Sequence, residues 1–204
     1  MAAELGADIR GIDASDSLIA IAREQQPGNI FQVGEMEELP FPDDTFDIVT
    51  GINSFQFAGN IVNALKEARR VTRKNGKVVM AVWGKPEDCE ASPVMKAISS
   101  FLPTPPQSNT PARPPLYSDG ILEALASEAG LKPGSAEEIK CLWDFNNESD
   151  AVRTMLSAGL STLAIQTAGE EKVHNSISRI IDGLKNQSGR VQLTNTFKCL
   201  VSVK

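Results

Sequence analysis

The first residue along the sequence that could take part in chemistry is Asp13, an acid at the expected end of a strand. Residues 8–13 have the composition of a short strand, which Gly11 weakens, and Ser15 could cap a helix that follows directly. In α/β folds that bind nucleotides, ligands lie beyond the carboxyl ends of the strands. The carboxylate of Asp13 could there accept hydrogen bonds from both hydroxyls of a ribose. Alternatively, Asp13 only helps to start the helix, and the residue alone does not decide between these interpretations.

A general base is harder to assign. Outside the acids, His174 and Tyr117 are the residues of suitable chemistry. His174 follows a polar helix start at residues 170–173 and is expected to be an exposed surface residue. The sequence therefore assigns no catalytic residue, and its single histidine excludes a multi-histidine metal site.

The composition is typical of one globular domain. The chain has 204 residues, of which 41% are hydrophobic and 23% charged, and its formal net charge is −6. This acidic balance argues against a nucleic-acid partner, and no apolar run approaches the roughly 18–20 residues that cross a bilayer. The start of the chain lacks the features of a signal peptide. Three widely separated cysteines favour the reduced cytoplasm over a disulfide framework: Cys89, Cys141 and Cys199.

Short apolar runs alternate with helical periodicity in the first half of the chain. We expect strands at residues 8–13, 29–33 and 46–52, and the continuous apolar run 78–83 is typical of a strand covered on both faces. A helix after the first strand would bury Leu18, Ile21 and Ala22. A helix after the third strand would bury Ile61, Leu65 and Ala68, and it would end at Asn75 and Gly76. This alternation predicts a doubly wound α/β fold.

A proline-rich stretch separates the two halves. Six of the twelve prolines lie between Pro103 and Pro115, which excludes a regular helix or a central strand there. The stretch is interpreted as a surface connection or, alternatively, as a loop over a ligand site.

The second half is expected to contain a helix, a strand, a helix pair and a final strand. Ser118 would cap the first helix and Gly130 would end it, and the helix pair would occupy residues 149–184. The strand before the pair alternates Ile139, Cys141, Trp143 and Phe145, and the final strand at residues 192–203 alternates Leu193, Phe197, Cys199, Val201 and Val203, with Asn195 interrupting.

Several motifs of the first half resemble one enzyme family in the same order. Residues 33–47 resemble the "GDAEELPFPDGSFD" stretch of class I S-adenosylmethionine-dependent methyltransferases, and residues 8–15 resemble their "VxGxDxS" second strand. Residues 46–53 are similar to the fourth strand. Residues 68–77 are similar to the "EArRVLKPGG" approach to the fifth strand, with Asn75 in place of the usual Pro or Gly. The likeness covers about the first 85 residues and is nearest to the ubiquinone/menaquinone-biosynthesis type of small-molecule methyltransferase.

This resemblance implies a Rossmann-like sheet, S-adenosylmethionine as cofactor and a small organic acceptor. It places Asp13 on the ribose hydroxyls, with Ala14 beside it in the cofactor site. Glu35 stands where the family has an Asp that takes the adenine amino group, and Met36 would offer a backbone amide and an apolar wall. Asn53 would lie near the methionine end of the cofactor.

Further roles stay open around this site. Phe55 and Phe57 would border the acceptor or, equally, serve only in packing. Glu37 and Glu38 are interpreted as solvated surface charges rather than catalytic acids.

The start of the sequence departs from the family. Residues 1–7 resemble the end of the first helix, so the first strand and its glycine-rich loop have no counterpart here. In the family this strand lies between the second and the fourth, and its absence would leave two strands with unpaired edges. Three explanations remain open: the sequence begins at an internal methionine, a partner copy donates a strand, or the sheet closes directly. The first best explains the origin of the gap, and we expect a dimer or another homo-oligomer.

The expected organisation is one methyltransferase-like domain over residues 1–204. It comprises a partial cofactor-binding half at 1–85, a proline-rich connection at 86–117, and a C-terminal half at 118–204 with a helical lid at 149–184. Methyl transfer to a small acceptor is the expected function. The alternatives are a non-catalytic fragment that binds a partner, and a nicotinamide-dependent oxidoreductase, which the 33–47 motif disfavours.

Overall fold

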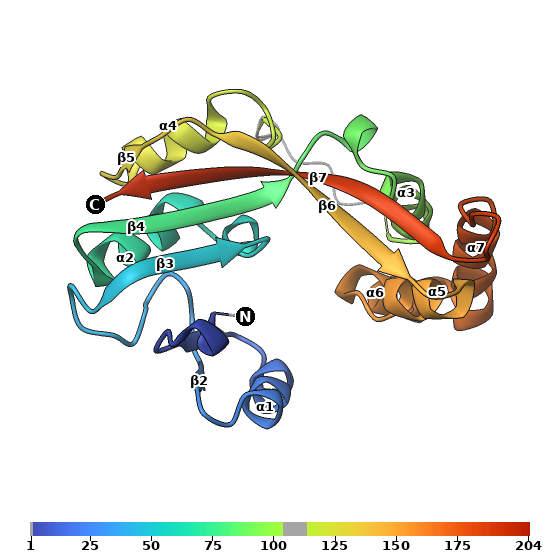
Figure 1. Cartoon of the computed structure of the whole chain (residues 1–204), viewed down its shortest axis with the longest axis horizontal. Coiled ribbons are helices and arrows are strands. Elements are labelled where there is room, and N and C mark those ends of the chain that lie inside the picture. The colour runs from blue at the N-terminus through green and yellow to red at the C-terminus, as the bar shows by residue number, and fades with distance from the viewer. Residues whose placement is uncertain (1, 104–113) are drawn as a thin grey trace. The chain divides into compact units, whose positions relative to one another are not determined.

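The computed structural model describes residues 2–103 and 114–204, which form two compact units (Figure 1). Unit 1 comprises residues 1–82, 118–137 and 199–204, and unit 2 comprises residues 83–117 and 138–198. Most of the stretch between Pro103 and Pro115 lies outside the described residues. Among the residues that are described, no helix combines the length and the apolar character needed to cross a membrane.

The strands form two separate sheets. In the first, β1 (Arg10–Asp13) pairs in parallel with β2 (Ile30–Val33). The second sheet has the order β3-β4-β7-β5, with β6 also paired to β7. Its strands are β3 (Phe46–Ile52), β4 (Thr72–Trp83), β5 (Lys132–Pro133), β6 (Glu137–Phe145) and β7 (Val191–Val203). Strand β3 is parallel to β4, whereas β5 is antiparallel to β7.

No backbone pairing joins β1 to β3 in the part of the chain that the structure describes. Direct closure of the sheet between these strands, one of the three explanations considered above, is therefore wrong for this structure. The α/β alternation itself is confirmed, and strand β3 has the bounds that the sequence predicts.

Helix α1 (Asp16–Gln25) begins as predicted, at Ser15, whose Oγ accepts a hydrogen bond from the Leu18 N–H. Its buried face differs from the prediction. Ile19 is buried, whereas Leu18 and Ile21 are exposed. The reason is that α1 packs on β1 and β2, two strands of four residues each, which are too short to cover a wider face.

Helix α2 (Ile61–Val71) buries the predicted face, including Ile61, Leu65 and Ala68. It ends four residues earlier than Asn75, however, so the predicted stop is wrong. The carbonyls of Arg70 and Val71 accept hydrogen bonds from the backbone of Asp44 and Thr45, at 3.1 and 2.8 Å. These amides satisfy the end of the helix, and β4 starts at once.

Helix α4 (Ile121–Glu128) contains the predicted residues but has Gly120, at φ +75°, as its N-cap in place of Ser118. Gly130, at φ +80°, follows its end as predicted, because glycine adopts the left-handed conformation readily.

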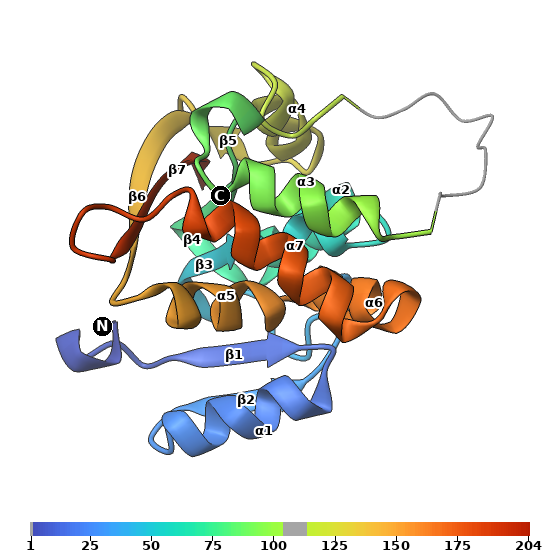
Figure 2. The ribbon, with the colours of Figure 1, turned by 90° about the vertical axis from the view of Figure 1, so that its right-hand side faces the viewer.

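Unit 2 contains a hydrophobic core to which four helices and the start of β7 contribute (Figure 2). These are α3 (Ser92–Ser100), α5 (Glu148–Leu156), α6 (Gly159–Ala168) and α7 (Glu170–Asp182). The region 149–184 thus holds three helices and not the predicted pair, because the chain breaks at Ser157 and Ala158. Asn147 caps α5, because its Oδ1 accepts a hydrogen bond from the Asp150 N–H at 2.9 Å.

The final strand is confirmed, but its alternation shifts. Up to Asn195 the buried side chains are at odd-numbered positions, such as Leu193. Thr196 is buried next to Asn195, and from there on the more buried side chains are at even-numbered positions. Val201 is 41% exposed, contrary to the prediction. Asn195 is tolerated inside because its Oδ1 accepts the Ala91 N–H at 3.0 Å.

Candidate functional site

The paired ends of β1 and β2 bring two of the predicted cofactor residues together. Asp13 lies opposite Val33, and the Gly34 N–H donates to the Asp13 carbonyl at 3.1 Å, so Asp13 and Glu35 follow adjacent strand ends. The Oδ1 atom of Asp13 accepts the Ser15 N–H at 2.8 Å. Asp13 therefore does help to start α1, as the alternative interpretation holds. Its Oδ2 has no protein partner among the described residues, so a ligand could still use it.

A tight turn follows β2. The Glu38 N–H donates to the Glu35 carbonyl at 3.2 Å, and we call residues 35–38 the acidic turn. Glu35 is exposed at its start and Met36 is partly buried. Ala14, on the other strand end, is exposed as well. The residues predicted to contact the adenine and the ribose therefore present accessible groups next to one another.

Asn53 lies directly after β3 in a strained conformation with a buried, unsatisfied oxygen. Its φ is +50°, and its N–H donates to the Ala81 carbonyl at 2.8 Å. Its Oδ1 is buried and has no hydrogen-bond partner among the described residues. An unpaired buried acceptor costs about 1–3 kcal/mol, and strained residues cluster at functional sites. The Asn53 side chain therefore suits a ligand that brings a hydrogen-bond donor, such as an ammonium group.

The two phenylalanines after β3 have different environments. Phe55 is 6% exposed, and its ring lies so close to Gly51 that a Cβ there would come within 2.2 Å of it. Phe57, in the same short 3₁₀ turn (Phe55–Phe57), is 76% exposed. The position of Phe55 is that of a packing residue, while Phe57 is free to meet a ligand.

Glu37 lies at the surface, as predicted, but it is partly buried and hydrogen-bonded to the chain. Its Oε1 accepts the backbone N–H of Asn60 at 2.9 Å, and its Oε2 accepts from Asn63 Nδ2 at 3.4 Å. Asn60 is the N-cap of α2, and a carboxylate is favourable at the positive end of a helix. The acidic turn is therefore held on the N-terminus of α2.

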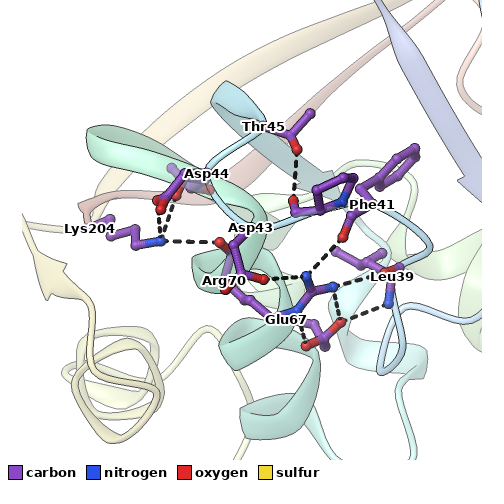
Figure 3. Close-up of polar contacts among 10 residues, drawn as sticks. Leu39, Phe41, Asp43, Asp44, Thr45, Glu67, Arg70 and Lys204 are labelled. Atoms are coloured by element: carbon purple, nitrogen blue, oxygen red, sulfur yellow. Dashed lines mark hydrogen bonds and ion pairs between the residues drawn. The ribbon is translucent and has the colours of Figure 1, made fainter.

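Two residues of α2 hold the loop that follows, residues 39–45 (Figure 3). Arg70 donates to the carbonyls of Leu39 and Phe41, each at 2.8 Å, and to Asp43 Oδ1 at 2.8 Å. Glu67 pairs with Arg70 at 2.7 Å and accepts the Leu39 N–H at 2.8 Å. The sequence analysis missed this role, although both residues lie in or next to the motif at residues 68–77.

The charges of this pair support each other. The hydrogen bond from Arg70 lowers the pKa of Glu67, and the Leu39 N–H acts in the same direction against the effect of burial. The pKa of Arg70 is raised above its usual range by Glu67 and Asp43. Both groups are therefore charged at neutral pH.

Lys204 secures the far end of the same loop (Figure 3). Its Nζ donates to Asp44 Oδ1 at 2.7 Å and to the carbonyls of Arg70 and Thr72 at 3.1 and 2.8 Å. Its side chain is only 17% exposed. Loop 39–45 is thus fixed at both ends by cationic side chains.

The two residues considered as general bases both lie in unit 2. His174 is exposed, with its Nδ1 3.5 Å from Ser178 Oγ, and it lines an open cavity together with Glu148 and Arg153. The carbonyl of Tyr117 accepts from Lys198 Nζ at 3.0 Å. Neither arrangement identifies a proton acceptor for catalysis.

Comparisons with known proteins agree with these motifs. Residues 1–80 match the family described as Methyltransferase domain. An uncharacterized methyltransferase YcgJ of Bacillus subtilis is 34% identical over 83 residues, which are 38% of this chain and 33% of the relative. The demethylmenaquinone methyltransferase of the same organism is 34% identical over 91 residues, which are 42% of this chain and 39% of the relative. The chain thus spans little more than a third of the curated relatives that it matches.

The fold agreement extends further along the chain. The crystal structure of the Bacillus subtilis YcgJ protein superposes with a TM-score of 0.54 over 97% of this chain and 82% of that one, at 19% identity. At this identity the likeness concerns the fold. Residues 1–80 are therefore similar in sequence to the methyltransferase-domain family, and the chain has a Rossmann-like fold similar to that of the YcgJ protein.

Proposed function

We propose that this chain transfers a methyl group from S-adenosylmethionine to a small organic acceptor. The single observation that carries the proposal is Asn53, whose strained backbone and buried, unpartnered Oδ1 stand at the carboxyl end of β3. The methyltransferase-domain sequence at residues 1–80 and the exposed acids Asp13 and Glu35 support it.

The residues present fit this cofactor. Asp13 would accept the ribose hydroxyls, beside Ala14, and Glu35 would accept the adenine amino group. Met36 would cover the adenine ring, and Asn53 Oδ1 would accept from the ammonium of the methionine portion. The cofactor itself supplies an activated methyl group, so the chain has to bind and orient its two ligands more than to activate them.

For the acceptor, we propose a site that includes Phe57, which is exposed and lies four residues after Asn53 in the chain. The proposal of a substrate lid for helices α5, α6 and α7 rests on their place in the chain, as an insertion between β6 and β7. Replacing Phe57 by alanine should then raise the KM for the acceptor and leave cofactor affinity unchanged.

Calorimetric titration with S-adenosylhomocysteine tests the proposal. Micromolar binding by the unchanged chain supports the enzyme. The competing function is a methyltransferase-like remnant that binds a partner, and it predicts no heat even at millimolar ligand. The separation of β1 from β3 favours this alternative, because the two halves of the cofactor site lie on different sheets. A change of NADH fluorescence on mixing would instead indicate the nicotinamide-dependent alternative.

We also propose that the chain associates with copies of itself. Strand β1 pairs on one side with β2, and β3 pairs on one side with β4, so each has one edge without a strand among the described residues. Unpaired strand edges favour association, because their backbone groups otherwise remain without partners. A strand supplied by a second copy would satisfy both edges.

A further inference from the structure

We infer that three residues, Glu37, Glu67 and Arg70, are positioning residues. They fix the acidic turn and loop 39–45 on α2. As a result, Glu35 and Asn53 can contact the same cofactor molecule. This inference rests on the proposed function. It concerns residues that contact no ligand themselves, because their polar atoms are engaged by the chain.

The first step is the separation that these residues bridge. Glu35 follows β2 in one sheet and Asn53 follows β3 in the other, and no described strand pairing joins the two sheets. Any ligand that contacts both residues needs them held at a constant distance. The segment that links β2 to β3, residues 34–45, can supply this tie.

The second step is that this segment is bound to α2 at successive points. Glu37 accepts from the N-cap residue Asn60, at the start of the helix. Leu39 is held two turns later, where its N–H donates to Glu67 and its carbonyl accepts from Arg70. Helix α2 is a rigid support, because its inner face is buried, with Leu65 1% exposed and Ala68 1% exposed.

The third step connects α2 to Asn53. The helix follows the short turn Phe55–Phe57 after residues 58–60, and Phe55 is packed on Gly51 of β3. A segment fixed on α2 is therefore also fixed relative to the end of β3. Glu37 acts at the position nearest to Glu35, and we expect its loss to release the acidic turn first.

The chain offers a matched control for each variant. Glu38 is the neighbour of Glu37, is exposed, and makes no side-chain hydrogen bond to another described residue. Arg69 is the neighbour of Arg70 on α2, but its Nε donates to the Gly130 carbonyl at 2.9 Å and not to loop 39–45. We therefore compare Glu37→Gln with Glu38→Gln, and Arg70→Met with Arg69→Met.

The first measurement is amide hydrogen exchange of the free chain. Glu37→Gln should accelerate exchange in residues 35–38, and Arg70→Met should accelerate it in residues 39–45, while Glu38→Gln and Arg69→Met leave both segments unchanged. Equal exchange in Glu37→Gln and the unchanged chain would overturn the inference. A loss of protection over the whole of unit 1 would overturn it as well, because it would show a general role in folding.

The second measurement is the affinity for S-adenosylhomocysteine. Glu37→Gln should weaken binding about tenfold, as expected for loss of charge-assisted hydrogen bonds, whereas Glu38→Gln should bind as the unchanged chain does. Equal affinity of Glu37→Gln and Glu38→Gln would overturn the inference. If the unchanged chain does not bind the ligand, the proposed function fails, and the exchange pattern separately decides whether Glu37 holds the turn.

Discussion

The carboxylate of Glu37 lies 2.9 Å from the backbone nitrogen of Asn60 and thereby ties the turn after β2 to the N-cap residue of α2. This contact links residues on either side of an unpaired seam, with β1 and β2 on one side and β3 and β4 on the other. The candidate cofactor site thus depends on a side-chain tie in addition to its strand ends.

Asp13→Ala should abolish measurable binding of S-adenosylhomocysteine. Losing a charge-assisted pair of hydrogen bonds to the ribose costs on the order of 2–4 kcal/mol. Because Asp13 Oδ1 also accepts the Ser15 N–H, Asp13→Asn is the cleaner variant, since it keeps an oxygen for that contact. Calorimetry on both variants, with circular dichroism to check the fold, decides the matter. Binding at the affinity of the unchanged chain would remove Asp13 from the site.

Asn53→Gly should separate stability from binding. Glycine adopts a φ of +50° without strain and removes the unpartnered Oδ1, so the free chain should melt at the same temperature or higher. The affinity for S-adenosylhomocysteine should fall by about tenfold, since one hydrogen bond to a charged group is lost. Thermal melting with and without the ligand measures both effects. A destabilised variant with unchanged affinity would mean that Asn53 is purely structural.

Acid should release loop 39–45 through Glu67. The pKa of Glu67 is lowered in the folded chain, chiefly by Arg70, so its contribution to stability is complete above the ordinary glutamate value of 4.5. This contribution is lost as the pH falls below that value and through the lowered pKa of the folded state. Amide exchange at Leu39, measured between about pH 6 and 3, should show the change.

Glu67→Gln provides the control for this pH effect. Glutamine does not titrate, so the exchange of the Leu39 amide should lose the part of its pH dependence that Glu67 causes. The same profile in the variant and in the unchanged chain would assign the effect to other carboxylates.

The open edges of β1 and β3 predict association. Light scattering at low micromolar concentration should give a mass of at least twice 21.9 kDa. Charged substitutions on the β3 edge strand, such as Thr50→Lys, should shift the mass towards the monomer. A well-folded monomer with one cooperative melting transition would contradict the prediction.

Elements that depend on local sequence were predictable, and contacts between distant residues were not. The bounds of β3 and the buried face of α2 follow from apolar periodicity, and both agree with the structure. The end of α2 depends on amides of Asp44 and Thr45, which lie more than 25 residues earlier in the chain. Periodicity carries no information about such partners.

The candidate site shows the same division. Asp13, Glu35 and Asn53 could be proposed as cofactor residues from the sequence because their motifs are local and ordered along the chain. Glu37 was interpreted as solvated because its partner is 23 residues away, and Arg70 reaches the Leu39 carbonyl across 31 residues. The three helices in residues 149–184 were predicted as a pair because apolar residues keep a helical spacing across the break at Ser157 and Ala158, from Leu156 to Leu160.

Titration of the isotope-labelled chain with S-adenosylhomocysteine, followed by NMR, tests the central claim most directly. We predict chemical-shift changes at the backbone amides of Ala14, Glu35 and Met36, together with the side-chain amide of Asn53, at micromolar ligand. Resonances of α5, α6 and α7 should change less. A spectrum that does not change at millimolar ligand, or that changes only in unit 2, would contradict a cofactor site at the ends of β1, β2 and β3.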